Sequence, residues 1–366
     1  MESFDQNIRK LHIIRGLAAL LVVIYHSKFI LWSGGSLYME QFQELNYLDC
    51  LLFGVDMLSS CGKQCVLVFF ILSGFVIHYN YGRSNKSLPL FYLIRAVRIY
   101  LPYLFSVVLS IGVLLFVVQM NPEIAIDGVR EYNSRLLIAF QDLNFKTIFN
   151  ALIFVPAQEY PGLNFAYWSL LHEGIFYVLY PLYFMIGKKA RLIVAGLFLG
   201  LSFAVNSMEL YYQVFFLLGV FLCDFYQSGR SIIATKNSNP WLYFGVICVG
   251  YIATNGVIKV ANEYYADLAA VLTILVAFDY IIIKGIKKYK LLTHLADISF
   301  SLYLNHLPVL LICYYLCVSV FGELIIFDRY PYYLSVIVSI IVCQVIYLFT
   351  EKQSLVLIKK IKSKWN

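Results

Sequence analysis

Two ionisable side chains, Arg15 and His26, stand in an apolar run near the N-terminus of this 366-residue chain. They are eleven residues apart, which is close to three helical turns, so a helix would place them on one face, about 16 Å apart along its axis. Ionisable groups inside a membrane-length apolar segment are costly and mark functional sites by default. An imidazole there is suited to accepting a proton or to attacking an activated carbonyl. The pair predicts an elongated binding site; the alternative is an interfacial arginine and a histidine satisfied by a backbone carbonyl.

Two further arginines, Arg95 and Arg98, precede a third apolar run. Their i and i+3 spacing places both on one face of a helix. The planar guanidinium group is suited to bidentate phosphate binding. We expect this pair, together with Arg15, to hold the phosphates of an anionic ligand; the competing interpretation is a cluster of charges that only fixes membrane orientation.

A carboxylate, Glu173, lies among aromatic residues in another apolar run, five residues after Trp168. A carboxylate at that depth needs a proton, a cation or a hydrogen-bonded partner. We expect Glu173 to orient His26 or to act as a base itself. Trp168 is a candidate contact for a bound substrate.

Polar side chains also recur through a ninth apolar run, at Ser301, Tyr303 and His306. These three could donate hydrogen bonds to an oxyanion that develops during a reaction. Ser73, beside Gly74, is a further candidate contact, although small residues at such positions more often allow close helix packing. We interpret Glu351, beside Lys352, as an interfacial charge.

The elements that must position these side chains are membrane-spanning helices. Hydrophobic residues make up 61% of the chain and charged residues 13%, against roughly 25% charged in soluble domains. Runs near the roughly 20 residues that cross a bilayer occur at 11–31, 64–81, 99–119, 166–186, 192–208, 211–227, 241–258, 266–283, 296–318 and 332–350. The sequence predicts an all-α polytopic membrane protein with about ten transmembrane helices.

Lysine and arginine are distributed unevenly between the predicted loops, which indicates orientation. With a cytoplasmic N-terminus, all but seven of the 28 fall on the cytoplasmic side. Both termini are therefore predicted to be cytoplasmic, and the net charge of +7 does not indicate nucleic-acid binding. We expect one domain over residues 1–366, with a core at 9–352 and a short basic tail at 353–366. No metal-ligand spacing is present, and Cys50, Cys61 and Cys65 leave a disulfide open.

Several of these motifs together resemble the membrane-bound acyltransferase-three family. The resemblance rests on the Arg15/His26 pair, Phe-Phe-Ile-Leu-Ser-Gly-Phe at 69–75, Arg-x-x-Arg at 95–98, Trp-Ser-Leu followed by Glu-x-x-Phe-Tyr at 168–177, and Ser-x-Ser-Leu-Tyr-Leu-x-His at 299–306. They occur in the family's order and span nearly the whole chain. Many relatives carry a C-terminal SGNH-hydrolase-like domain, and we expect none in this chain.

The resemblance implies a function and its partners. The expected reaction transfers an acyl group, most simply acetyl, from cytoplasmic acyl-CoA to a hydroxyl of a surface or lipid-linked carbohydrate such as O-antigen, capsule or exopolysaccharide. Acetyl-CoA would be a substrate, with no permanently bound cofactor, and the expected location is the bacterial inner membrane. The alternatives are a membrane transporter or flippase, and an acyltransferase for another group such as succinyl.

Overall fold

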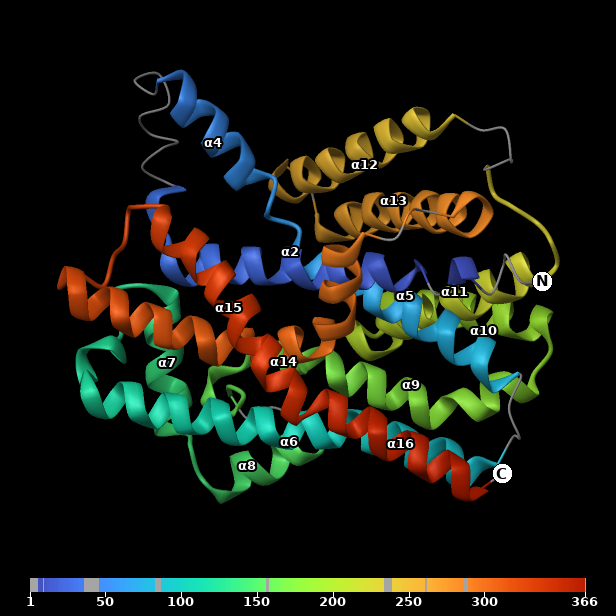
Figure 1. Cartoon of the computed structure of the whole chain (residues 1–366), viewed down its shortest axis with the longest axis horizontal. Helices are drawn as coiled ribbons and strands as arrows, with labels where there is room; N and C mark the ends of the chain where they lie inside the picture. The colour runs from blue at the N-terminus through green and yellow to red at the C-terminus, as the bar shows by residue number, and fades with distance from the viewer. Residues whose placement is uncertain are drawn as a thin grey trace. The chain divides into compact units, whose positions relative to one another are not determined.

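The computed structural model describes residues 6–8, 10–35, 46–82, 87–155, 158–233, 239–260, 262–285, 287 and 289–365. Within these ranges every regular element is a helix (Figure 1), so the all-α prediction is confirmed. The orientation of the termini stays a prediction.

All ten apolar runs form helices where the sequence predicted them. They are α2 (His12–Leu31), α5 (Gly62–Tyr81), α6 (Leu88–Met120), α9 (Trp168–Met185), α10 (Lys188–Ala204), α11 (Met208–Gln227), α12 (Pro240–Val260), α13 (Glu263–Lys284), α14 (Lys290–Phe321) and α15 (Tyr330–Phe349). Eight of them belong to segments long and apolar enough to cross a membrane. The other two are α9 and α10. Helix α10 has 17 residues, fewer than the roughly 20 that span a bilayer without thinning it.

Shorter helices connect these segments. They are α4 (Tyr47–Met57), η2 (Pro122–Ile124), α7 (Glu131–Gln141), α8 (Phe145–Leu152), η3 (Pro161–Leu163) and η4 (Phe165–Tyr167). The basic tail also forms a helix, α16 (Glu351–Trp365).

The chain divides into two compact units that are interleaved along the sequence. The first unit comprises 1–19, 63–92 and 172–297, and the second comprises 20–62, 93–171 and 298–366. The expectation of a single domain over 1–366 stays a prediction.

The first unit contains a close helix contact at the small residues of α5. A Cβ atom built on Gly74 would lie 2.0 Å from the carbonyl oxygen of Phe216 in α11. A Cβ atom on Gly219 would lie equally close, at 2.0 Å, to the carbonyl oxygen of Ile71. Only glycine permits this approach, which confirms that Gly74 is a packing position.

The second unit contains a break in the hydrogen bonding of α14. Pro308 has no N–H, so the carbonyl of Leu304, four residues earlier, lacks its usual helical donor. Ser106 Oγ and Asn164 Nδ2 each donate to that carbonyl at 2.8 Å. Side chains therefore replace the missing backbone bond, as the hydrocarbon environment requires.

Glu351 is also part of the second unit, and the interfacial interpretation of this residue is wrong. Glu351 is buried, with 1% of its surface exposed. Its carboxylate accepts hydrogen bonds from the backbone N–H of Ser301 at 3.1 Å and from the Ser301 hydroxyl at 3.0 Å. It joins the start of α16 to the middle of α14.

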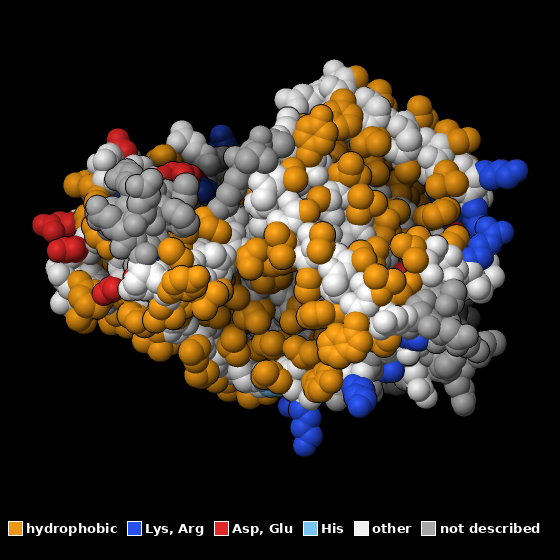
Figure 2. Space-filling model, turned by 90° about the horizontal axis from the view of Figure 1, so that it is seen from above, with side chains coloured by type: hydrophobic (Ala, Val, Ile, Leu, Met, Phe, Trp, Pro, Cys, Tyr) orange, Lys and Arg blue, Asp and Glu red, His pale blue; other side chains and the backbone are white. Residues whose placement is uncertain are grey.

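Much of the exterior is apolar. In the view of Figure 2, hydrophobic side chains cover a broad, continuous area and charged side chains form small separate groups. Large apolar side chains such as Trp241, Val249 and Phe349 are exposed by 78%, 67% and 71%. An apolar exterior on long apolar helices is what a lipid solvent requires.

Candidate functional site

A histidine pair forms the centre of the candidate site in the second unit. The Nδ1 atom of His26 in α2 lies 2.8 Å from the Nε2 atom of His306 in α14. The rings are nearly parallel, with centroids 5.0 Å apart. His306 is fully buried and His26 is half-buried. Two of the residues singled out from the sequence therefore meet directly, although 280 positions separate them.

The hydrogen bonds of the pair fix the tautomer of each ring. The Nδ1 atom of His306 lies 3.0 Å from the carbonyl oxygen of Leu302, which can only accept, so this nitrogen carries a proton. In a neutral imidazole the other nitrogen is then an acceptor. His26 must therefore donate from Nδ1 to His306, which leaves a lone pair on His26 Nε2. That nitrogen is the basic atom of the site.

An aromatic and ionic layer lies beside His26. The Phe165 ring packs edge-on against the His26 ring at 5.0 Å between centroids. On Phe165 lies the Arg135 guanidinium, 4.7 Å from the ring centroid. Glu159 accepts from Arg135 Nε at 2.6 Å and from Nη2 at 2.9 Å, and this bidentate hydrogen bond raises the pKa of the Arg135 guanidinium. The Arg135–Glu159 ion pair thus lies against the Phe165 ring.

A pocket of about 510 Å³ adjoins this layer, and we call it the aromatic pocket. It is lined by Tyr25, Lys28, Phe29, Trp32, Ser33, Gly35, Met57, Ser60, Arg130, Glu131 and Tyr132. The Tyr25 ring lies 5.1 Å from the His26 ring, and the Phe29 ring lies 6.3 Å from the Phe165 ring. Aromatic faces with a few fixed polar groups are the usual lining of small-molecule sites.

The other two candidates in α14 hold structural hydrogen bonds. The Ser301 hydroxyl donates to Glu351, as described above. The Tyr303 hydroxyl lies 3.0 Å from the carbonyl oxygen of Ala166 and 2.8 Å from Ser169 Oγ. These contacts anchor α14 to the start of α9, the helix that Trp168 begins. Their expected part in oxyanion stabilisation stays a prediction.

Glu173 has the hydrogen-bonded partners that its depth demands. In the first unit, the Ser73 hydroxyl donates to its carboxylate at 3.3 Å and the Tyr177 hydroxyl donates to the same oxygen. Ser73 and Glu173, both candidate site residues, are thus brought together. The expectation that Glu173 orients His26 stays a prediction.

The arginine candidates occupy two different settings. In the first unit Arg15 donates from Nη2 to the carbonyl of Ala296 at 2.8 Å, and its neighbour Gly16 allows α14 to approach closely. Arg95 and Arg98 lie in α6 and are half-buried. Their role in holding phosphate groups stays a prediction.

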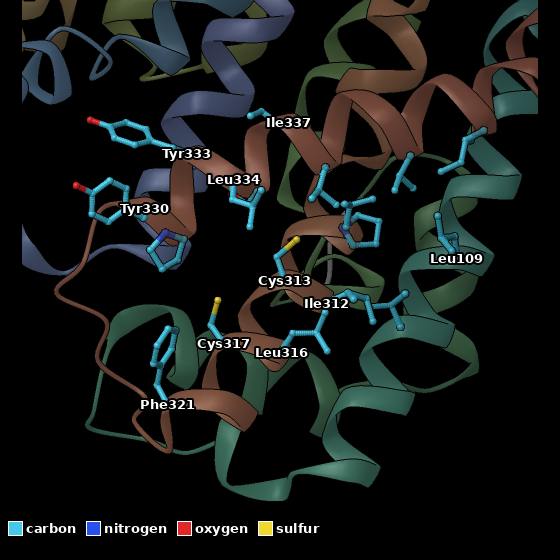
Figure 3. A pocket seen from close by; sticks show the side chains of 18 of the residues that line it. Leu109, Ile312, Cys313, Leu316, Cys317, Phe321, Tyr330, Tyr333, Leu334 and Ile337 are labelled. Carbon is cyan, nitrogen blue, oxygen red and sulfur yellow. The ribbon is translucent and has the colours of Figure 1, made fainter.

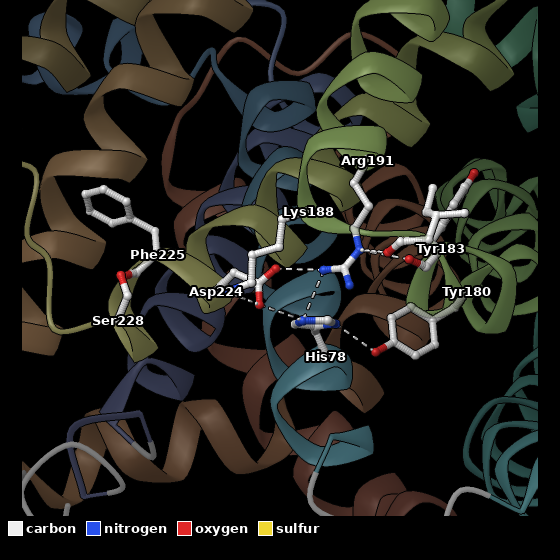
Figure 4. A network of polar contacts seen from close by, with 9 residues as sticks. His78, Tyr180, Tyr183, Lys188, Arg191, Asp224, Phe225 and Ser228 are labelled. Atoms are coloured by element: carbon white, nitrogen blue, oxygen red, sulfur yellow. Dashed lines mark hydrogen bonds and ion pairs between the residues drawn. The ribbon is translucent and has the colours of Figure 1, made fainter.

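Sequence reasoning missed a charged network in the first unit (Figure 4). Asp224 in α11 pairs with Arg191 Nη1 at 2.7 Å, Lys188 Nζ at 3.2 Å and His78 Nε2 at 3.2 Å. The other nitrogen of His78 lies 3.0 Å from the Tyr180 hydroxyl. The available signal was Asp224 itself, an acidic residue that stands alone near the end of an apolar run.

Within the described ranges, no group of three or more His, Cys, Asp or Glu side chains is arranged to hold a metal ion. Cys61 and Cys65 are buried and Cys50 is half-buried.

A family model described as an acyltransferase domain, acyltransferase 3, matches residues 8–348. No curated protein and no solved structure shows a significant match to the chain.

Proposed function

Because this chain belongs to the acyltransferase-three family of membrane proteins, we propose that it transfers an acetyl group from acyl-CoA to a carbohydrate hydroxyl. The observation that carries the proposal is the contact between the two histidine rings, from which the tautomer of each ring is inferred. His306 Nε2 accepts a hydrogen bond from the Nδ1–H of His26. His26 Nε2 therefore keeps the lone pair that a general base needs.

The reaction follows from that lone pair. His26 Nε2 takes the proton of the acceptor hydroxyl while the oxygen attacks the thioester carbon. A C–O bond forms, the C–S bond breaks, and the proton passes from His26 to the departing thiolate. His306 is a positioning residue, because it sets the His26 tautomer in the way that a second hydrogen bond sets any catalytic histidine.

A second route would use the same lone pair as a nucleophile. His26 Nε2 would attack the thioester carbon first, so that a C–N bond forms while the C–S bond breaks, and the CoA thiolate leaves with the proton that the acylated ring loses. The acceptor hydroxyl would then attack the acyl-imidazole, forming the C–O bond as the C–N bond breaks and returning a proton to the imidazole. Intact-protein mass spectrometry after rapid mixing with acetyl-CoA alone separates the routes, because only the acyl-enzyme route gives a transient acetyl adduct lost in His26→Ala.

The donor site is proposed at Arg95 and Arg98. Acyl-CoA is anionic at its nucleotide end, and two guanidinium groups on one helix face can bind its phosphates bidentately. Replacing both residues with glutamine should raise the apparent KM for acyl-CoA and leave the apparent KM for the acceptor unchanged. An unchanged KM for acyl-CoA would show that the two charges serve membrane orientation alone.

The acceptor site is proposed at the aromatic pocket. Its aromatic rings would cover the apolar faces of a sugar, and the side chains of Lys28, Ser60 and Glu131 would bind its hydroxyls. Phe29 and Tyr25 connect this pocket to the His26 ring through the ring contacts given above.

The proposed function is tested by release of free CoA thiol from acetyl-CoA by the purified protein in nanodiscs. The acceptor is a crude lipid-linked glycan fraction, and the variants are His26→Ala and His294→Ala. His294 is an exposed histidine of α14 and provides a matched control. We expect acceptor-dependent release in the wild type and the control, and none in His26→Ala. Near wild-type release in a folded His26→Ala protein would refute the assignment of His26.

A further inference from the structure

Helix α15 accounts for a complete crossing of the hydrocarbon. Together with α6 and α14 it lines an apolar groove, and its part of the lining extends from Tyr330 to Ile346 (Figure 3). Apolar side chains also remain exposed on α15 every three or four residues, at Leu334, Ile337, Ile341, Val345 and Phe349. The helix contains 20 residues and none is charged. Its rise is therefore about 30 Å, which is the thickness of the hydrocarbon core.

Helix α16 consequently begins at the surface of the bilayer. Phe349 is the last residue of α15, and charged residues reappear directly afterwards at Glu351 and Lys352. Thr350, between the two helices, has φ −118° and ψ −83°, which are not helical values, and α16 takes a different direction from α15 (Figure 1). The first turn of α16 thus lies at the boundary between the hydrocarbon and the lipid headgroups.

The inner side of α16 is fixed to the second unit. Glu351 accepts two hydrogen bonds from Ser301, as described above, and Ser354 and Ile358 are buried. Positions 351, 354 and 358 are spaced by three and four residues, so they lie on one side of the helix. Helix α16 is therefore held in one rotation about its axis, and its opposite side faces outward.

The exposed surface of α16 is strongly basic. Its five lysines are all exposed; they are Lys352, Lys359, Lys360, Lys362 and Lys364. The one acidic side chain of this helix is Glu351, which is buried. Within the described ranges, none of the five lysine side chains has an ion pair or a hydrogen bond with another residue. The helix therefore presents several positive charges that the protein itself does not neutralise.

The spacing of these lysines favours an external anion. Lys360 and Lys364 are four residues apart, so they share a side of the helix, and like charges at this spacing repel one another. A phosphate group beside them removes the repulsion, because it accepts charge-assisted hydrogen bonds from ammonium groups. Lys188 and Arg191 in α10 show the other solution, since both pair with Asp224 of the protein.

Apolar side chains stand among the lysines. Val356 and Leu357 are exposed in the middle of α16, and Trp365 is exposed at its end. A helix that combines lysines with exposed apolar residues is typical of one at a bilayer surface, where lysine stems stay in apolar surroundings and the ammonium groups reach the phosphates. Tryptophan is enriched at the same level. A lipid gives these apolar side chains a partner, whereas a soluble phosphate does not.

From the place where α16 begins, its unpaired lysines and the apolar side chains among them, we propose that this helix binds anionic phospholipids. The lysine ammonium groups contact the lipid phosphates, and Val356, Leu357 and Trp365 contact the adjoining part of the acyl chains. The proposal goes beyond acyl transfer and does not depend on it.

The test uses the full chain in nanodiscs and the fluorescence of Trp365, without acyl-CoA. Subtracting the emission of Trp365→Phe separates this residue from the other tryptophans. Brominated phosphatidylglycerol or brominated phosphatidylcholine is added in increasing mole fraction, and the ratio of the two fractions that quench Trp365 by half gives the preference for the anionic lipid. We expect a clear preference for phosphatidylglycerol. It should disappear at about 1 M salt, where charges are screened beyond about 3 Å.

Variants of the outward lysines locate the binding. Lys360→Gln should lower the preference about fivefold, and Lys364→Gln should do the same, because each lysine near an anionic surface contributes a similar attraction. Lys360→Arg keeps the charge and should behave like the wild type. Lys146→Gln, which removes an exposed lysine of α8, is the matched control for loss of charge and should also leave the preference unchanged.

Retention of phosphatidylglycerol by the protein in detergent, measured by native mass spectrometry, provides a second measurement that does not depend on Trp365. It should fall in the two glutamine variants and stay unchanged in both controls. Equal quenching by the two lipids in the wild type would overturn the proposal, as would an unchanged preference in glutamine variants that melt like the wild type. Loss of the preference on adding CoA or inorganic phosphate would also overturn it, because the lysines would then bind soluble phosphates.

Discussion

The hydrogen bond between His26 and His306 gives the sharpest prediction, because it connects a single contact to the rate of the reaction. In His306→Leu, the His26 Nδ1–H loses an acceptor that lies 2.8 Å away. Leaving a buried donor without a partner costs about 1–3 kcal/mol. If the transition state is destabilised by that free energy relative to the enzyme–substrate complex, kcat falls about 5- to 150-fold, because each 1.36 kcal/mol is a factor of ten in rate.

The assay is CoA thiol release in nanodiscs at saturating acceptor. We expect kcat to fall within that range and the KM for acyl-CoA to change by less than about twofold, because His306 acts through His26 and binds no substrate. His306→Gln should recover much of the activity, since its amide oxygen can accept the same proton. The pH profile should change in His306→Leu and be largely restored in His306→Gln.

His294→Leu provides the control on the same helix and should be neutral, because His294 is exposed. A His306→Leu protein with an unchanged melting temperature and a kcat within twofold of the wild type would refute the reasoning, because His26 would then work without the acceptor that fixes its tautomer.

Three further predictions concern other contacts. Asp224→Asn should lower the free energy of unfolding by about 3 kcal/mol, because the Arg191 guanidinium loses the carboxylate with which it pairs, and both side chains are only 12% exposed. Thermal melting in detergent measures this loss. Gly74→Ala should lower the free energy of unfolding by about 1–3 kcal/mol, because the added Cβ would overlap the carbonyl oxygen of Phe216. The same melting measurement would show this. Glu159→Gln should lower kcat/KM for the acceptor about fivefold, because it weakens the Arg135–Glu159 ion pair, whose side chains are 28% and 12% exposed.

These three predictions have their own controls. Gly112→Ala in α6 should be neutral, because nothing lies within 4 Å of the added methyl group; a Gly74→Ala protein as stable as Gly112→Ala contradicts the packing argument. Asp224→Asn should leave both KM values unchanged in the folded fraction. An unchanged kcat/KM in Glu159→Gln would show that the Arg135–Glu159 ion pair does not support the layer beside His26.

The helices were predictable because membrane-spanning segments have a strong signal. Every apolar run became a helix, since lipid offers the backbone no other partner. The pairing of His26 with His306 was not predictable, although both residues were singled out, because the sequence contains no information on which helices adjoin. On charge alone the sequence favoured Glu173 as a partner for His26, and that stays a prediction, whereas the contact that the structure shows is with His306.

Loop residues were the weakest part of the sequence reasoning. Arg135, Glu159 and Phe165 form the layer beside His26, yet their types and spacing resemble those of any polar connection. Glu351 was misinterpreted for a related reason: a glutamate beside a lysine at a span end usually faces water, and only the fold shows that Ser301 donates to it.

Pro308 has a consequence for how the protein assembles in its membrane. A newly inserted α14 carries a Leu304 carbonyl that no donor of its own helix can reach, and in hydrocarbon such a group costs several kcal/mol. Its two donors, Ser106 and Asn164, come from α6 and from the residue that precedes η4. The Leu304 carbonyl, two residues from His306, therefore gains its hydrogen bonds only when α14 packs against these two segments, which lie far upstream in the chain. Formation of the histidine pair is thus coupled to the packing of α14 against them.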